Sequence, residues 1–196
     1  MKIPRPTTLQ GQKVTLLPLS QDQASEYLAI GQDADVWQFL APDPFKLLAD
    51  AKYWIESMLC RQQDSGSVTF SVYDNGSGKL AGTSSFLDVR IEHEGLEIGY
   101  TWYGHAFRRT YVNTATKLIL LEHAFDELGA IRVQLQTDAR NQRSQKAIER
   151  IGAVKEGVLR SHKIYPNGFI RDSVLYSITR QEWPSVRATL ENSLLR

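Results

Sequence analysis

Residues 97–128, EIGYTWYGHAFRRTYVNTATKLILLEHAFDEL, contain the local signals that decide the fold. An apolar strand is expected over residues 97–102, followed by a loop with the paired arginines Arg108 and Arg109 and by a helix that begins near Asn113. The apolar residues of this helix recur with helical spacing, at Leu118, Leu121, Phe125 and Leu128. The expected unit is a strand, a cationic loop and a helix N-terminus.

This junction suits a bound anion. The first N–H groups of a helix have no partner within the helix, and the helix dipole places positive partial charge at the same end. The guanidinium groups of Arg108 and Arg109 add donors that match phosphate geometry. We therefore expect a ligand with a phosphate or pyrophosphate group at residues 108–114. A solvated basic loop in an ordinary α/β unit is the alternative interpretation.

The composition is that of a folded globular protein. The chain has 196 residues, of which 42% are hydrophobic and 23% charged, enough for one domain with a substantial core. The formal net charge of +1 provides no global electrostatic reason to bind nucleic acid or an anionic membrane. Neither is expected as a partner.

The single cysteine, Cys60, excludes an intrachain disulfide and a metal site built from several cysteines, and no metal is expected. It lies in a helical pattern, and a structural role is expected because nothing nearby predicts an activated thiol. The N-terminus has no apolar run of signal-peptide length, and no segment is long enough to span a bilayer. The expected location is the cytoplasm.

The segments before this stretch predict a helical and then an antiparallel region. A first strand is expected over residues 14–19, and Ser20 is a candidate cap for a helix over residues 22–31. Pro42 and Pro44 mark a break before an amphipathic helix over residues 45–62. Strands are then expected over residues 68–73, 80–89 and 94–102, with a turn at residues 74–78.

The segments after the central helix complete the predicted sheet. A strand over residues 131–136 should run parallel to residues 97–102, because a helix connects the two. A short helix should begin at Asn141 and end at Gly152. The remaining predictions are strands over residues 153–159 and 171–179, joined by a tip at residues 166–168, and a closing helix over residues 183–195. We predict one mixed α/β (α+β) domain over residues 1–196, whose sheet of about seven mostly antiparallel strands includes one parallel pair and is flanked by helices.

The order of these elements resembles the GNAT superfamily of N-acetyltransferases over nearly the whole chain. The most specific segments are EIGY at 97–100, AFDELG at 124–129, NQRS at 141–144, IGA at 151–153, and EGVLR at 156–160 leading to RDSVLYS at 171–177. Their joint order resembles the branch named for bacterial ribosomal-protein alanine and serine N-terminal acetyltransferases. The resemblance implies acetyl-CoA as donor and co-substrate, with a protein N-terminus or a small primary amine as acceptor. It also implies a homodimer as a plausible assembly.

The loop departs from the family pattern at two positions. GNAT proteins usually have small residues where this chain has Tyr111 and Asn113, so that backbone N–H groups close on the pyrophosphate. One interpretation is a wider loop that binds the same anion with the side chains of Arg108, Arg109 and Thr110 together with Asn113. The other is weak or lost binding of coenzyme A.

The resemblance also assigns candidate residues to acyl transfer. Glu97 is the candidate general base, through water, and Ser144 the candidate acid for the leaving thiolate, because Ile148 replaces the tyrosine of many relatives. A strand-edge ion pair for Glu97 and a local backbone contact for Ser144 are the alternatives. The residues expected to contact the cofactor are Tyr100, Thr101, Trp102, Tyr103, Arg108, Arg109, Thr110, Tyr111, Val112, Asn113, Thr114, Asn141 and Ser144.

The acceptor side has weaker signals. Trp37 and Glu97 are the candidate acceptor-binding residues, with a place in the core as the alternative for Trp37. His93 and His105 flank the expected cleft, either as proton-transfer groups or as surface residues. Two other functions are considered beside catalysis: a coenzyme A-binding module with little or no activity, and a GNAT scaffold for protein association.

Overall fold

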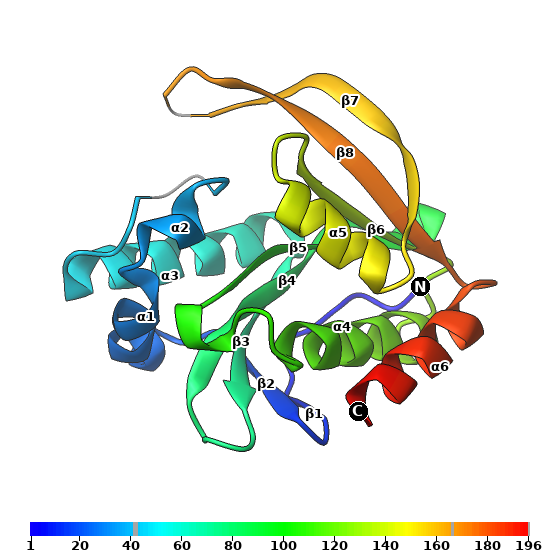
Figure 1. Cartoon of the computed structure of the whole chain (residues 1–196), viewed down its shortest axis with the longest axis horizontal. Coiled ribbons are helices and arrows are strands. Elements are labelled where there is room, and N and C mark those ends of the chain that lie inside the picture. Colours follow the sequence, from blue (N-terminus) through cyan, green and yellow to red (C-terminus); the bar gives the residue numbers. More distant parts are fainter. Residues whose placement is uncertain (41–42, 166, 196) are drawn as a thin grey trace.

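The chain folds around an eight-stranded sheet with the strand order β1-β2-β3-β4-β5-β6-β8-β7 (Figure 1). This computed structural model describes residues 1–40, 43–165 and 167–195. Pro42 and Pro166, which the sequence analysis assigns to a break and a turn, lie outside the described residues. The strands are β1 (Leu9–Gln10), β2 (Val14–Pro18), β3 (Val68–Asp74), β4 (Leu80–Arg90), β5 (Gly95–Tyr103), β6 (Arg132–Asp138), β7 (Val154–Ile164) and β8 (Ile170–Thr179).

The predicted fold class is confirmed, with one strand more than expected. All neighbouring strands pair antiparallel except β5 and β6, which are parallel and connected through a helix as the sequence analysis predicts. The additional strand is β1, which has only two residues and is too short to show a periodic pattern.

Two helical layers cover the sheet. The helices are α1 (Ala24–Gly31), α2 (Ala34–Trp37), α3 (Leu48–Ser65), α4 (Val112–Glu122), α5 (Gln142–Arg150) and α6 (Trp183–Leu194), and α4 continues as the π-helical turn η4 (His123–Glu127). Short 3-10 turns lie between these elements: η1 (Gln21–Gln23) between β2 and α1, η2 (Ile91–His93) between β4 and β5, and η3 (His105–Phe107) between β5 and α4. Within the described ranges, no helix combines the length and apolar character that crossing a bilayer requires.

The helix starts follow local capping. Ser20 and Gln23 form a capping box that leads into α1, as the choice of Ser20 as a cap implies. Helix α3 begins at Leu48 and not at residue 45, because the carboxylate of Asp50 accepts the N–H of Leu47 at 2.8 Å and caps the first turn. Cys60 lies on the exposed face of α3 and does not belong to the core, and its structural rather than reactive role stays a prediction.

The residues of β3 alternate between the two faces of the sheet. Val68, Phe70 and Val72 of β3 pack into the larger of two hydrophobic clusters with residues of α4, α5 and α6. The intervening Ser71 faces the opposite side, where the hydroxyl of Tyr27 from α1 lies 2.8 Å from its Oγ. Helices α1 and α3 therefore cover one face of the sheet, and α4 covers the other.

The β7–β8 hairpin projects beyond the rest of the sheet and reaches towards α2 (Figure 1). Strand β7 continues to Ile164, five residues past the predicted end, and most of its side chains are exposed. The hydroxyl of Tyr165 donates a hydrogen bond to the carbonyl oxygen of Phe39 at 3.0 Å. This contact attaches the tip of the hairpin to the segment that follows α2.

Candidate active site

A cleft opens where β5 and β6 separate. The two strands pair only from Gly95 with Arg132 to Glu97 with Gln134, although β5 continues to Tyr103 and β6 to Asp138. The space between them is part of a cavity of about 1040 Å³. Ligands of open α/β sheets bind beyond the carboxyl ends of such strands, so the separation marks the candidate active site.

Strand β5 has a bulge at the edge of this cleft. Across the β4–β5 pair, Thr83 faces Trp102 and Ser85 faces Gly99, so Tyr100 and Thr101 occupy the space of one residue. Tyr100 has a φ of 45°, a conformation that is rare for residues other than glycine. The distortion that the family resemblance implies at Gly99 and Tyr100 is present, with Tyr100 as its strained residue.

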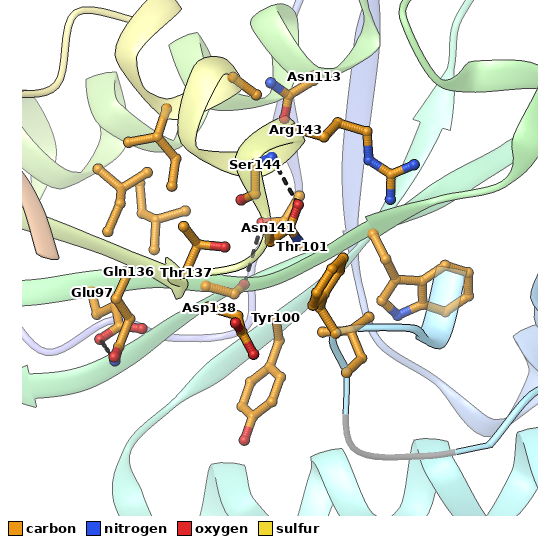
Figure 2. Close-up of a pocket in the computed structure, with 18 of the residues that line it drawn as sticks. Glu97, Tyr100, Thr101, Asn113, Gln136, Thr137, Asp138, Asn141, Arg143 and Ser144 are labelled. Carbon is orange, nitrogen blue, oxygen red and sulfur yellow. Dashed lines mark hydrogen bonds between the residues drawn. The ribbon is translucent and has the colours of Figure 1, made fainter. Parts of the chain in front are cut away.

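Glu97 is almost completely buried at the point where the strands divide. Its Oε2 accepts a hydrogen bond from Nε2 of Gln136 at 2.6 Å (Figure 2). It accepts a second one from Nε2 of Gln134 at 3.1 Å. Burial raises the pKa of Glu97 above its usual value, although the amide of Gln136 and the charge of Lys163 oppose this shift. Among the described residues, no arginine or lysine nitrogen lies within 4.0 Å of its carboxylate, so the alternative of a direct ion pair is absent.

Gly99 provides the space that this carboxylate occupies. A Cβ atom at position 99 would lie 3.0 Å from Oε1 of Glu97 and 2.7 Å from Cδ1 of Leu87. Both distances are shorter than ordinary contacts between nonbonded atoms. The glycine in the EIGY segment therefore allows Glu97 to lie beside the bulge.

Lys117 lies on the other side of the bulge and was not predicted. Its Nζ donates to Oγ1 of Thr101 at 2.7 Å and to Oγ of Ser84 at 3.1 Å. Burial lowers its pKa to about 7, and in the described part of the chain no carboxylate pairs with it. A lysine among the apolar residues of the inner face of α4 was the available signal in the sequence.

Helix α5 presents two of the predicted residues to the cleft. Asn141 precedes the helix, and its Oδ1 accepts the backbone N–H of Ser144 at 3.0 Å (Figure 2). This cap satisfies the backbone at Ser144 without its hydroxyl, and both residues line the cavity. The Ser144 hydroxyl is therefore available to a ligand.

Only part of the cationic loop faces the cleft. Arg108 is held by the protein, because its Nη2 lies 3.0 Å from Oδ2 of Asp33 and its Nε donates to the carbonyl oxygen of Tyr103 at 3.1 Å. Arg109, with a φ of 60°, and Thr110 line the cavity beside it.

The bulky residue at the first unusual loop position does not fill the cavity. The side chain of Tyr111 turns outward and donates a hydrogen bond to Oδ1 of Asp74, whereas Asn113 lines the cavity. Val112 and Thr114 are buried in the first turn of α4 and do not line the cavity. Of the residues predicted to contact the cofactor, Tyr111, Val112 and Thr114 therefore present no side chain to the cleft.

Further cations surround this end of the cleft. Three of them, Arg143, Lys146 and Arg150, belong to α5 and line the same cavity as Arg109 and Asn113. Cations next to the N-terminus of a helix such as α4 favour phosphate groups. The donor set therefore fits a ligand with several phosphates, as the sequence analysis expected at residues 108–114.

The remaining predicted residues are distributed between core and surface. Trp37 does not line the acceptor side: only 5% of it is exposed, its Nε1 donates to the carbonyl oxygen of Gly31 at 2.7 Å, and its ring packs 4.9 Å from that of Trp102. Trp102 itself is buried in the same aromatic cluster, although it borders the cavity. His93 and His105 are exposed and do not line the cavity. The described residues contain no group of three or more metal-binding side chains.

Comparison with known proteins agrees with this geometry. Residues 13–154 match the acetyltransferase (GNAT) domain family. The chain is 30% identical over 147 residues to the "Putative ribosomal N-acetyltransferase YdaF" of Bacillus subtilis (strain 168), which covers 75% of this chain and 78% of that protein.

Two solved structures extend the comparison. A GCN5-related N-acetyltransferase from Brucella melitensis superimposes with a TM-score of 0.90 at 25% identity, over 97% of this chain and 86% of that chain. The microcin C7 self-immunity acetyltransferase MccE, solved in complex with acetyl-CoA and AMP, superimposes with a TM-score of 0.75 at 25% identity, over 86% of this chain and 93% of that chain. The chain belongs to the GNAT family and is an acetyltransferase.

Proposed function

We propose that the protein transfers an acetyl group from acetyl-CoA to a primary amine. The observation that carries this proposal is the placement of two kinds of group along one cleft: the buried carboxylate of Glu97 where β5 and β6 separate, and the phosphate-type donors of α4 and α5. Transfer from a phosphate-bearing thioester requires a base for the amine and a binding site for the anionic donor. Here the two lie on either side of the strand bulge.

The donor would be held at the α4–α5 end. Arg109 and Asn113 offer side-chain donors to the pyrophosphate, together with the N–H groups of the first turn of α4 that follow Val112. The Thr110 hydroxyl is engaged within the loop, because it donates to the carbonyl oxygen of Phe107 at 2.8 Å and accepts the N–H of Val112 at 3.2 Å. Arg143 adds a cation on the facing helix. The outward side chain of Tyr111 supports retained binding, because the residue that replaces a small one leaves the cavity open.

Glu97 would remove the proton from the acceptor amine, directly or through a water molecule. Its pKa, raised by burial, is closer to neutral pH than that of an ordinary glutamate and so favours proton acceptance. The amine nitrogen then attacks the thioester carbonyl carbon, and the backbone at the Tyr100 bulge supplies donors to the carbonyl oxygen.

Collapse of the adduct breaks the C–S bond and releases a thiolate. Ser144, whose backbone N–H is already satisfied by Asn141, would give its hydroxyl proton to the sulfur and recover one from solvent. Ile148 lines the same cavity and has no proton to donate. Ser144 is therefore the candidate acid from α5.

The acceptor is a protein N-terminus or a small amine. A single catalytic domain over residues 1–196, a cytoplasmic location and a homodimer remain predictions that accompany this proposal.

Calorimetric titration with acetyl-CoA and coenzyme A, with ATP and NADH as controls, tests the cofactor. Selective binding in the micromolar range, about −8 kcal/mol, is expected. Thiol release is then measured with a panel of amines, comparing wild type with Glu97→Gln and with the exposed control Glu92→Gln. Binding without thiol release for any amine would replace the proposal with a coenzyme A-binding module, and no binding would refute the cofactor itself.

A further inference from the structure

The end of the cleft opposite the α4–α5 donors is also cationic. Arg61 of α3, Lys163 of β7 and Arg171 of β8 line it, and they approach from three different elements. The cleft walls partly desolvate the ammonium of Lys163, which lowers its pKa, although the side chain keeps contact with solvent. The charges of Arg171 and Arg61 lower this pKa further, whereas the charge of Glu97 raises it. Lys163 and Arg171 are cross-strand partners in the β7–β8 hairpin, and both line the same cavity as Arg61 and Glu97.

These cations have no carboxylate partner within the described residues. Arg61 instead donates from Nη1 to the hydroxyl of Tyr100 at 3.0 Å. Arg171 donates from Nη1 to the hydroxyl of Tyr165 at 3.3 Å, and its Nε is buried without a hydrogen-bond partner. A buried guanidinium donor without an acceptor is costly unless a ligand supplies one.

The carboxylates that line the cleft are already engaged. Asp138 pairs with Arg140 at 2.8 Å, and Asp88 pairs with Arg90 at 3.5 Å. Glu97 accepts its hydrogen bonds from two glutamines. The charges of Glu97 and Asp88 near Lys163, and of Asp138 near Arg171, therefore offset the positive charge at this end only in part, because none of these carboxylates forms an ion pair with the three cations.

Two tyrosines fix the positions of two of these cations, Tyr165 of the hairpin that of Arg171 and Tyr100 of β5 that of Arg61. Because Tyr165 is bonded both to Phe39 and to Arg171, the guanidinium is held between the hairpin and the segment after α2. Tyr100 points away from Ser144 and Asn113 (Figure 2) and bonds Arg61 of α3. The cations thus belong to the acceptor side of the bulge and not to the side proposed for the donor.

We propose that the amine acceptor carries an anionic group, a carboxylate or a phosphate, which Arg61, Lys163 and Arg171 bind while its amine reaches Glu97. This inference rests on the proposed acetylation of an amine. An arginine pair binds either anion through parallel N–H donors, and a net positive wall disfavours acceptors with a second cationic group.

Matched acceptors test the proposal. We compare the kcat/KM of ethanolamine with that of phosphoethanolamine, and the kcat/KM of alaninamide with that of alanine. Each value is calculated for the concentration of the unprotonated amine, because only this form is a nucleophile. The anionic member of at least one pair should be preferred by about tenfold or more; the two pairs separate a phosphate from a carboxylate preference. Equal use of charged and neutral amines would overturn the inference and leave the proposed acetyl transfer intact.

Variants identify the residues responsible. Arg171→Gln and Lys163→Gln should each raise KM for the preferred anionic acceptor by about tenfold and leave KM for acetyl-CoA and for the neutral acceptor within about twofold. Arg160→Gln removes an exposed charge from the same hairpin and should change neither value. A preference that persists in both cleft variants would also overturn the assignment, and thermal unfolding checks that each variant is folded.

A direct binding measurement covers the case of no turnover. Phosphoethanolamine is titrated into the complex with coenzyme A, for wild type and for Arg171→Gln. Binding that is lost in the variant supports the anion site, even if no amine in the panel is acetylated. Absence of binding to the wild type as well as of turnover would refute the site, whereas loss of coenzyme A binding would refute the proposed function first.

Discussion

Replacement of Lys117 by methionine should change how the stability of the protein depends on pH. The Nζ of Lys117 is buried, and its hydrogen-bond partners are the hydroxyls of Thr101 and Ser84. These hydroxyls also lie 2.7 Å from each other, so they remain hydrogen-bonded when the ammonium is removed. Methionine is similar in length and needs no partner, which makes Lys117→Met a mild steric change.

The magnitude follows from the shift in pKa. Burial lowers the pKa of Lys117 from 10.5 to about 7, so between these values the unfolded chain holds a proton that the native protein has released. Stability contributed by this group therefore rises with pH through this window. From pH 7 to pH 9 the ammonium of the native protein loses its remaining half proton, while that of the unfolded chain stays charged. The free energy of unfolding then rises by up to about 1.4 kcal/mol per pH unit, which sums to about 2 kcal/mol over this range.

Urea unfolding at pH 7, 8 and 9 measures this contribution. The free energy of unfolding of wild type minus that of Lys117→Met should increase by about 2 kcal/mol over this range, in favour of the wild type at higher pH. Lys52→Met, an exposed change on α3, provides the matched control and should show no such trend. A difference that stays constant from pH 7 to pH 9 would refute a buried, readily deprotonated Lys117.

Three further predictions concern the cleft and the core. Glu97→Gln should lower kcat by about 10²-fold with unchanged affinity for acetyl-CoA. It should also remove the acidic limb of the pH–rate profile, which in wild type lies at higher pH than for an ordinary glutamate because burial raises the pKa of Glu97. An unchanged limb would exclude Glu97 as the base. Arg109→Gln should weaken acetyl-CoA binding about tenfold by calorimetry, whereas the same change at the exposed Arg5 should not; equal losses would indicate non-specific attraction. Trp37→Ala should destabilise the protein by about 3–5 kcal/mol in urea unfolding without a specific change in KM, and a selective rise in the KM of the acceptor would return Trp37 to the acceptor site.

The order of the elements was predictable because each has a strong local pattern. Alternating apolar residues in β3 and helical spacing in α4 are local properties, and the parallel pairing of β5 with β6 follows from their helical connection. Strand β7 was predicted to end early because its outer half is exposed on the edge of the sheet and has no apolar alternation. Local patterns thus identify elements that are packed on at least one face.

The candidate site was only partly predictable because side-chain directions depend on distant partners. Tyr111 turns out of the cleft towards Asp74, a residue 37 positions away in the sequence. Trp37 is buried because it meets Phe45 and Trp102 in an aromatic cluster that no single helix contains. Arg108 borders the cleft, and its contact with Asp33 was not visible from the loop.

The bulge at Tyr100 is the feature that combines these groups into one site. Before it, Leu96 and Ile98 pack into the cluster beneath α4, whereas after it Tyr103 does so and Trp102 packs on the opposite face. The extra residue therefore exchanges the faces to which odd and even positions point. In a regular strand, positions 97 and 100 would face opposite sides of the sheet.

With the bulge, the side chains of Glu97 and Tyr100 lie on the same side of the sheet. The side chain of Thr101 lies on the opposite side, where it accepts a hydrogen bond from Lys117. The strain of one residue with a φ of 45° thereby places the tyrosine that binds Arg61 on the side of the candidate base, whose own position is set by the pairing of Glu97 with Gln134. Without the extra residue, Tyr100 would point to the face that α4 covers, and Arg61 would lose this hydroxyl. The bulge thus joins the acceptor wall to the strand that carries the base, which is what the strained conformation contributes to the site.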